Sequence, residues 1–168
     1  MSKIEERLAE MGIELPRPPL PVANYTCGTE VGEIVYVSGT VGTKVDDNGE
    51  DYNPYPGQAG DIPFEDAYAS ARLTAINHLS MIKHVIGDLD RMVRIVKMVG
   101  YINAKPGFKD APQIMNGASD FWVELLGEER GRHARAALYQ DQLTIDAPIE
   151  IEMTIQVKPR DDHETPEL

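Results

Sequence analysis

The stretch that decides the fold reads Ile149-Glu150-Ile151-Glu152-Met153-Thr154-Ile155-Gln156-Val157. Apolar and polar side chains alternate through it without a break. Because successive side chains of a β-strand point to opposite faces of a sheet, the pattern predicts a strand with one apolar and one polar face. It also predicts that Glu150 is held on a rigid backbone, on the polar face.

A second stretch, Gly131-Arg132-His133-Ala134-Arg135-Ala136, leads into another predicted strand over 134–139. The guanidinium of Arg135 can hold a carboxylate through two parallel hydrogen bonds. Arg135 and Glu150 are therefore the parts needed to hold and hydrolyse a small acidic molecule. Plainer interpretations stay open: Arg135 could form a surface ion pair, and Glu150 could belong to the solvated face of its strand.

Hydrophobic periodicity places the other elements around these two strands. Apolar residues recur every three or four positions in two stretches that begin at Pro63 and Pro112, and these are predicted to be helices ending at Gly87 and Gly127. A short helix is predicted over 3–11, and further strands over 25–30, 34–38 and 92–102. The order predicts an α+β sheet with both helices on one face.

Proline, glycine and acidic residues mark the segments outside this core. Residues 1–20 are expected to form a helix and a proline-rich arm, 21–158 the folded domain, and 159–168 a loose acidic tail. The segment 43–62 is rich in Asp, Asn, Gly and Pro and predicts a long surface loop. Its role as a lid or as surface decoration stays open.

Composition narrows the classes of function. The formal net charge is −12, which disfavours binding to a phosphate backbone. A single cysteine, Cys27, excludes an intrachain disulfide, and no apolar run reaches bilayer length. The N-terminus lacks the pattern of a signal peptide, so a cytoplasmic location is expected. Binding to nucleic acid or to a membrane is not expected.

Several residues have plain structural interpretations. Cys27 is expected to be a small buried hydrophobe, and Phe121 and Trp122 are expected to lie in the core. The four histidines show no metal-ligand spacing. His133 would share a side with Arg135 and could tune a pocket there, but a solvated histidine at the end of a loop is the favoured interpretation.

Taken in order, these stretches resemble the reactive intermediate deaminase family, also called YjgF-like. No single motif is specific, but the ordered set spans most of the chain, from Pro21 to Val157. The resemblance rests on Tyr25, Val37-Ser38-Gly39, Ala71-Arg72, Asn77, Asn116, Ala134-Arg135 and Ile149-Glu150-Ile151-Glu152.

The resemblance implies a chorismate-mutase-like α+β fold that assembles as a homotrimer around a central barrel, with active sites in clefts between subunits. The implied activity is hydrolysis of reactive enamines and imines, such as 2-aminoacrylate or 2-iminobutanoate, to 2-keto acids and ammonia. It uses no metal or organic cofactor. Arg135 and Glu150 are implied as catalytic, and the implied substrate-binding residues are Tyr25, Ser38, Gly39, Asn116 and Ala137.

The chain also departs from the family pattern. After Arg135 the family usually has a small residue or cysteine followed by Val-Glu-Val, whereas this chain reads Ala136-Ala137-Leu138-Tyr139. This indicates a divergent branch, in which the fold is little affected and the choice of substrate stays open. One alternative is a module that binds 2-keto acids without turnover. Ribonuclease activity, sometimes attached to the family, is disfavoured by the acidic charge.

Overall fold

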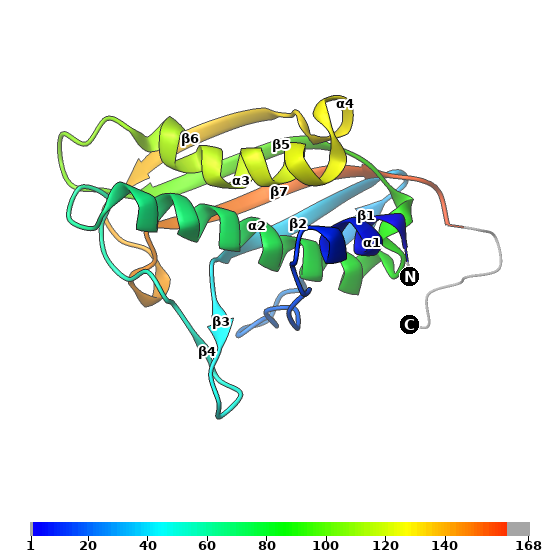
Figure 1. Ribbon diagram of the computed structural model, residues 1–168, viewed down its shortest axis with the longest axis horizontal. Helices are drawn as coiled ribbons and strands as arrows, with labels where there is room; N and C mark the ends of the chain where they lie inside the picture. The colour runs from blue at the N-terminus through cyan, green and yellow to red at the C-terminus, as the bar shows by residue number, and fades with distance from the viewer. Residues whose placement is uncertain (1, 161–168) are drawn as a thin grey trace.

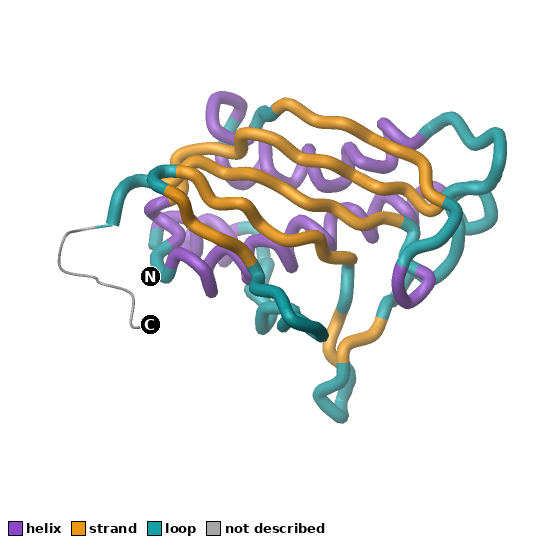
Figure 2. Tube along the Cα trace, turned by 180° about the vertical axis from the view of Figure 1, so that it is seen from behind, coloured by secondary structure: helices purple, strands orange, loops and turns teal. Residues whose placement is uncertain are grey.

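The computed structural model describes residues 2–160, and its centre is a five-stranded mixed sheet of order β1-β2-β7-β5-β6. All neighbouring pairs are antiparallel except β5 and β6, which run parallel. Helices α2 and α3 cover one face (Figure 1), and the other face carries no helix of residues 2–160 (Figure 2). The predicted α+β architecture is confirmed. The elements are β1 (Gly28–Val31), β2 (Ile34–Val41), α2 (Phe64–Ile86), β5 (Met92–Asn103), α3 (Ala111–Leu126), β6 (Ala134–Gln140) and β7 (Ile149–Val157).

Strand β7 lies between β2 and β5 and has the alternation that its sequence predicts. Its odd-numbered residues, from Ile149 to Val157, are buried beneath the helices. Glu152 is exposed on the bare face, and Glu150 is partly buried there. Burial of the apolar set stabilises the register, because a slip of one residue would turn that set toward the open face.

The helical layer packs tightly because glycine lies where α2 and α3 cross. A Cβ atom at Gly117 would collide with the backbone carbonyl of Tyr68 in α2. Phe121 and Trp122 of α3 are fully buried, as predicted, and meet edge to face with ring centroids 5.2 Å apart. Cys27 is also buried, as predicted.

The segment 43–62 was predicted to be a loop, but it contains a small hairpin. Strands β3 (Lys44–Val45) and β4 (Asp51–Tyr52) pair antiparallel and project from the body of the molecule (Figure 1). Arg17 pairs with Asp51 at 3.1 Å, and this contact ties the N-terminal arm to the hairpin.

Short helices that periodicity did not predict complete the chain. They are η1 (Leu89–Arg91), α4 (Glu128–Gly131) and η2 (Thr144–Asp146). The predicted N-terminal helix is α1 (Lys3–Glu10), and its Ile4 and Leu8 are buried in the main core. The predicted acidic tail lies beyond residue 160, outside the described residues, apart from its first two positions.

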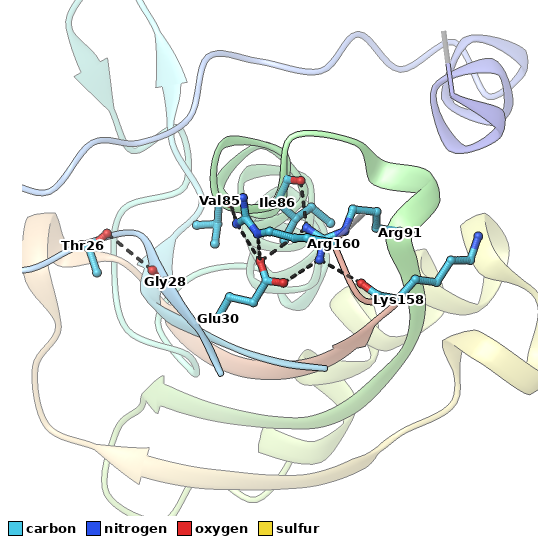
Figure 3. Close-up of polar contacts among 8 residues, drawn as sticks. All are labelled: Thr26, Gly28, Glu30, Val85, Ile86, Arg91, Lys158 and Arg160. Carbon is cyan, nitrogen blue, oxygen red and sulfur yellow. Dashed lines mark hydrogen bonds and ion pairs between the residues drawn. The ribbon is translucent and has the colours of Figure 1, made fainter. Parts of the chain in front are cut away.

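Glu30 of β1 joins segments that lie far apart in the sequence (Figure 3). Its carboxylate accepts hydrogen bonds from Arg91 at 2.5 Å and from Arg160 at 2.7 Å. Arg91 also donates to the carbonyls of Ile86 and Lys158, at 3.1 and 2.8 Å. Although burial alone would raise the pKa of Glu30, the hydrogen bonds from the two arginines lower it below its ordinary value.

Candidate functional site

Arg135 lies near the start of β6, on the helix side of the sheet. Its Nη1 donates to Ser119 Oγ of α3 at 2.8 Å, and its Nη2 donates to the carbonyl of Pro112 at 3.1 Å. A guanidinium has five N–H donors, so three remain available. Within residues 2–160, no carboxylate lies at ion-pair distance from Arg135. The side chain is thus held in place with donors free for an anion.

The guanidinium opens into a cavity of ≈ 680 Å³ between α3, α4 and the start of β6, here called the Arg135 groove. Asn116 lines the same groove, one helical turn before Ser119. Ala137 follows Arg135 on the same side of β6 and packs against the core. The structure thus brings the predicted residues Arg135 and Asn116 together in the groove and places Ala137 beside them.

A second group of predicted residues gathers around the end of β2. The register of β2 against β7 shifts between Val37 and Thr40, so Ser38 and Gly39 form a bulge. Glu150 lies directly over Gly39, and a Cβ atom at position 39 would overlap the Glu150 carboxylate. The hydroxyl of the neighbouring Ser38 donates to the carbonyl of Thr26 at 2.6 Å. Tyr25, which directly precedes Thr26 in the chain, has half of its surface exposed.

These two groups lie apart within one chain. Arg135 points to the helix side, where it contacts α3. Glu150 points to the bare face, where it neighbours Glu152 and the cross-strand residue Tyr101. One chain therefore does not bring Arg135 and Glu150 face to face, and a site that uses both requires a second copy.

In the second group, around the end of β2, the carboxyl group of Glu150 is a weaker acid than an ordinary glutamate. Burial, together with the charge of Glu152, raises the pKa of Glu150 above its ordinary value. Behind the bulge, His78 is buried and its Nε2 lies 3.2 Å from the carbonyl of Ser38. Burial lowers the pKa of His78 to about 4, so the ring is neutral at pH 7 and Nε2–H donates to that carbonyl. His78 thereby supports the bulge, a role that sequence reasoning missed.

His133 differs from its prediction as a solvated histidine at the end of a loop. It is partly buried in the Arg135 groove, and its Nε2 lies 3.1 Å from Ser119 Oγ. Ser119 was also missed, although its position three residues after Asn116 on a helix placed it on the same face.

Within the described part of the chain, no cluster of three or more His, Cys, Asp or Glu residues is arranged to bind a metal. Nor does any described helix have the length and apolar character needed to cross a bilayer.

The protein belongs to the α+β class: two helices cover one face of a mixed sheet, and the Arg135 groove lies beside the parallel strand pair at its edge. The family model described as "YjgF/chorismate_mutase-like, putative endoribonuclease" matches residues 5–150. The chain belongs to this family, so the predicted family and its fold are confirmed.

Individual relatives support the assignment. Protein TCP17 of Trypanosoma cruzi is 33% identical over 156 residues, covering 92% of this chain and 94% of that protein. The crystal structure of Atu1372 from Agrobacterium tumefaciens, a protein described as of unknown function, is 34% identical, with a TM-score of 0.77 over 92% of this chain and 93% of its own. A protein of Shewanella oneidensis described as a "putative endoribonuclease" is 27% identical, with a TM-score of 0.82 over 92% of this chain and 99% of its own.

Proposed function

We propose that this protein hydrolyses reactive 2-imino acids and their enamine tautomers to 2-keto acids and ammonia, in clefts formed between copies of the chain. The observation that carries the proposal is Arg135, which is fixed by two protein contacts, has no carboxylate partner in the described chain, and opens into a groove. A 2-imino acid carries its carboxylate next to the reacting carbon. Binding that carboxylate therefore also orients the carbon that water attacks.

The separation of the two residue groups supports a shared site. Arg135, Asn116 and Ala137 would come from one copy, and the group around Glu150 from the next. The bare sheet face that carries Glu150 is free to meet another copy, as the resemblance to a trimeric family implies. Neither copy alone then holds a complete site.

The proposed hydrolysis needs only a bound carboxylate, a water molecule and one group that transfers protons. Water adds to the imine carbon while Glu150 accepts its proton and passes it to the imine nitrogen, which gives a carbinolamine. Glu150 then takes the carbinolamine hydroxyl proton as the carbonyl forms and delivers it to the departing nitrogen, so ammonia leaves and the enzyme is unchanged after each cycle. Each turnover consumes one imine and one water. Because free imines already hydrolyse quickly, positioning alone gives a useful acceleration.

The direct test generates 2-iminobutanoate with an amino-acid oxidase and follows its decay in competition with semicarbazide trapping. The expected result is that catalytic amounts of the protein suppress semicarbazone formation. Unchanged trapping with several 2-imino acids would remove the deaminase proposal.

The alternative is a binding module for 2-keto acids. It is favoured by the placement of Arg135 and Glu150 on opposite faces of one sheet, because a single chain could bind a carboxylate without a proton acceptor nearby. Calorimetry with 2-oxobutanoate separates the two functions: binding combined with a null imine assay supports the module. Ribonuclease activity is less compatible with a net charge of −12.

The raised pKa of Glu150 predicts an acid limb in the pH profile. If Glu150 accepts a proton from water, only its ionised form is active, and kcat/KM falls as the pH drops through this raised pKa. The fall should begin at a higher pH than an ordinary glutamate would give. Glu150→Gln is expected to lower kcat/KM by about 10²-fold and to remove the limb. A limb that persists in Glu150→Gln would assign it to another group.

Gly39→Ala tests how the bulge supports Glu150. The added methyl group would occupy the position of the Glu150 carboxylate, so we expect the carboxylate to move and kcat/KM to fall by about tenfold. Thermal stability should change by only about 1 kcal/mol, because Glu150 can swing toward the bare face. Gly49→Ala in the β3–β4 turn is the control: its Cβ position is open but its φ is +84°, so it should cost about 1 kcal/mol of stability through backbone strain and keep full activity per folded molecule.

A further inference from the structure

The Arg135 groove contains a continuous line of hydrogen bonds that the proposed reaction does not use. Arg135 Nη1 lies 2.8 Å from Ser119 Oγ, and Ser119 Oγ lies 3.1 Å from His133 Nε2. His133 Nδ1 lies 2.6 Å from the carbonyl of Gly131. Gly131 can approach α3 this closely because a Cβ atom there would collide with the carbonyl of Trp122.

The partners fix the direction of each hydrogen bond. A carbonyl only accepts, so His133 Nδ1 carries the hydrogen that Gly131 receives. In the neutral ring, Nε2 is then an acceptor, and the Ser119 hydroxyl donates its hydrogen bond to it. Ser119 Oγ in turn accepts from Arg135. With His133 neutral, the Ser119 hydroxyl is therefore directed at the imidazole.

The surroundings of His133 keep its ring neutral near pH 7. Burial lowers the pKa of His133, and the charge of Arg135 lowers it further. Charged groups face this region from every neighbouring element: Arg94 of β5, Asp120 and Glu124 of α3, Glu128 of α4, and Arg132 and Arg135 around β6. Glu124 and Glu128 already pair with Arg72 and Arg132. A bound carboxylate next to Arg135 would add a new negative charge to this set.

We propose that Ser119 is a second hydrogen-bond donor to the ligand's carboxylate beside Arg135, and that His133 is the positioning residue that releases the Ser119 hydroxyl by taking up a proton when the anion binds. In the imidazolium form, Nε2–H donates to Ser119 Oγ. The hydroxyl hydrogen is then free to turn toward the carboxylate. The proton comes from solvent, and the anion compensates the added positive charge. This inference rests on the proposed role of Arg135 in binding a carboxylate.

Calorimetry tests the coupling with 2-oxobutanoate as the probe, between pH 5.5 and 8, in buffers of different ionisation enthalpy. Wild-type protein is expected to bind more tightly as the pH falls and to take up a fraction of a proton on binding. Glu150 of the neighbouring copy also titrates beside the proposed ligand, so the effect of His133→Gln is measured in the Glu150→Gln background. There His133→Gln, which cannot titrate, should remove both the pH dependence and the proton uptake. Ser119→Ala should bind about tenfold more weakly, with Ser119→Thr restoring most of the affinity. His84→Gln, at an exposed position on α2, is the matched control and should behave as wild type.

Each outcome has one interpretation. Proton uptake that persists in His133→Gln in the Glu150→Gln background, or unchanged affinity in Ser119→Ala, would overturn the inference while the deaminase proposal stands. Unchanged affinity in Arg135→Ala would instead refute the carboxylate site itself. If wild type does not bind 2-oxobutanoate, the inference also fails, whereas the imine-decay assay still judges the deaminase proposal independently. Thermal midpoints of all variants identify any that lose binding through unfolding.

Discussion

Arg135→Ala is expected to lower kcat/KM for 2-iminobutanoate hydrolysis by about 10³-fold, the loss appropriate to a charged, bidentate contact in a cleft that a second copy encloses, as proposed above. The structure gives the reason. Ser119 and Pro112 hold the guanidinium by two of its donors, and the remaining donors face the groove. Among the described residues that line the groove, Arg132 is the other arginine, and it is already paired with Glu128.

Arg135→Lys distinguishes charge from geometry. An ammonium keeps the charge but loses the planar fork, so we expect about a tenth to a hundredth of wild-type activity. The control is Arg7→Ala, which removes an exposed arginine whose one ion pair within residues 2–160 is with Glu10 of α1. The measurement is imine decay, together with light scattering to show that the assembly is unchanged. Full activity in Arg135→Ala would refute the proposed site.

Glu30→Gln is expected to have the largest effect on stability, lowering the free energy of unfolding by about 3 kcal/mol. The carboxylate is only 13% exposed, and its loss would leave Arg91 and Arg160 facing each other without their shared counter-charge from Glu30. For a chain of this size, the expected fall in the thermal midpoint is roughly 6–12 °C. Activity per folded molecule should be unchanged.

The pH dependence of this loss identifies its electrostatic origin. Because the pKa of Glu30 is lower in the folded state, its stabilisation is fully present above the pKa of the unfolded chain. It disappears as the pH falls through the folded-state pKa, so wild type and Glu30→Gln should converge in acid. Glu33→Gln, an exposed neighbour in the β1–β2 turn, is the control. A constant difference down to pH 2 would contradict the ionic explanation.

The fold was predictable because its long elements carry strong periodicity. The alternation in β7 and the helical repeats in α2 and α3 each extend over enough residues to identify the buried face. The β3–β4 hairpin escaped prediction because strands of two residues are too short to show alternation. Helix α4 is a single turn, and its packing depends on the close approach of Gly131 to α3.

The candidate site was predictable only in part. The sequence indicated Arg135, Asn116 and Glu150, and the first two share a groove. Alternation assigns faces within one strand, but it cannot relate β6 to β7, which are separated by β5 and its register shifts. The opposite orientations of Arg135 and Glu150 therefore emerged only from the structure. The contact between Ser119 and His133 likewise depends on how α4 returns the chain toward the sheet.

The bulge in β2 has a consequence for how this sequence can diverge. Because the carboxylate of Glu150 occupies the space where a side chain at position 39 would begin, the two positions cannot drift independently. A homologue that acquires a larger residue at position 39 must shorten or reorient the acid at position 150 in the same lineage. In an alignment of homologues, covariation between positions 39 and 150 would therefore separate proteins that retain the carboxylate over the bulge from proteins in which the pocket has a different function.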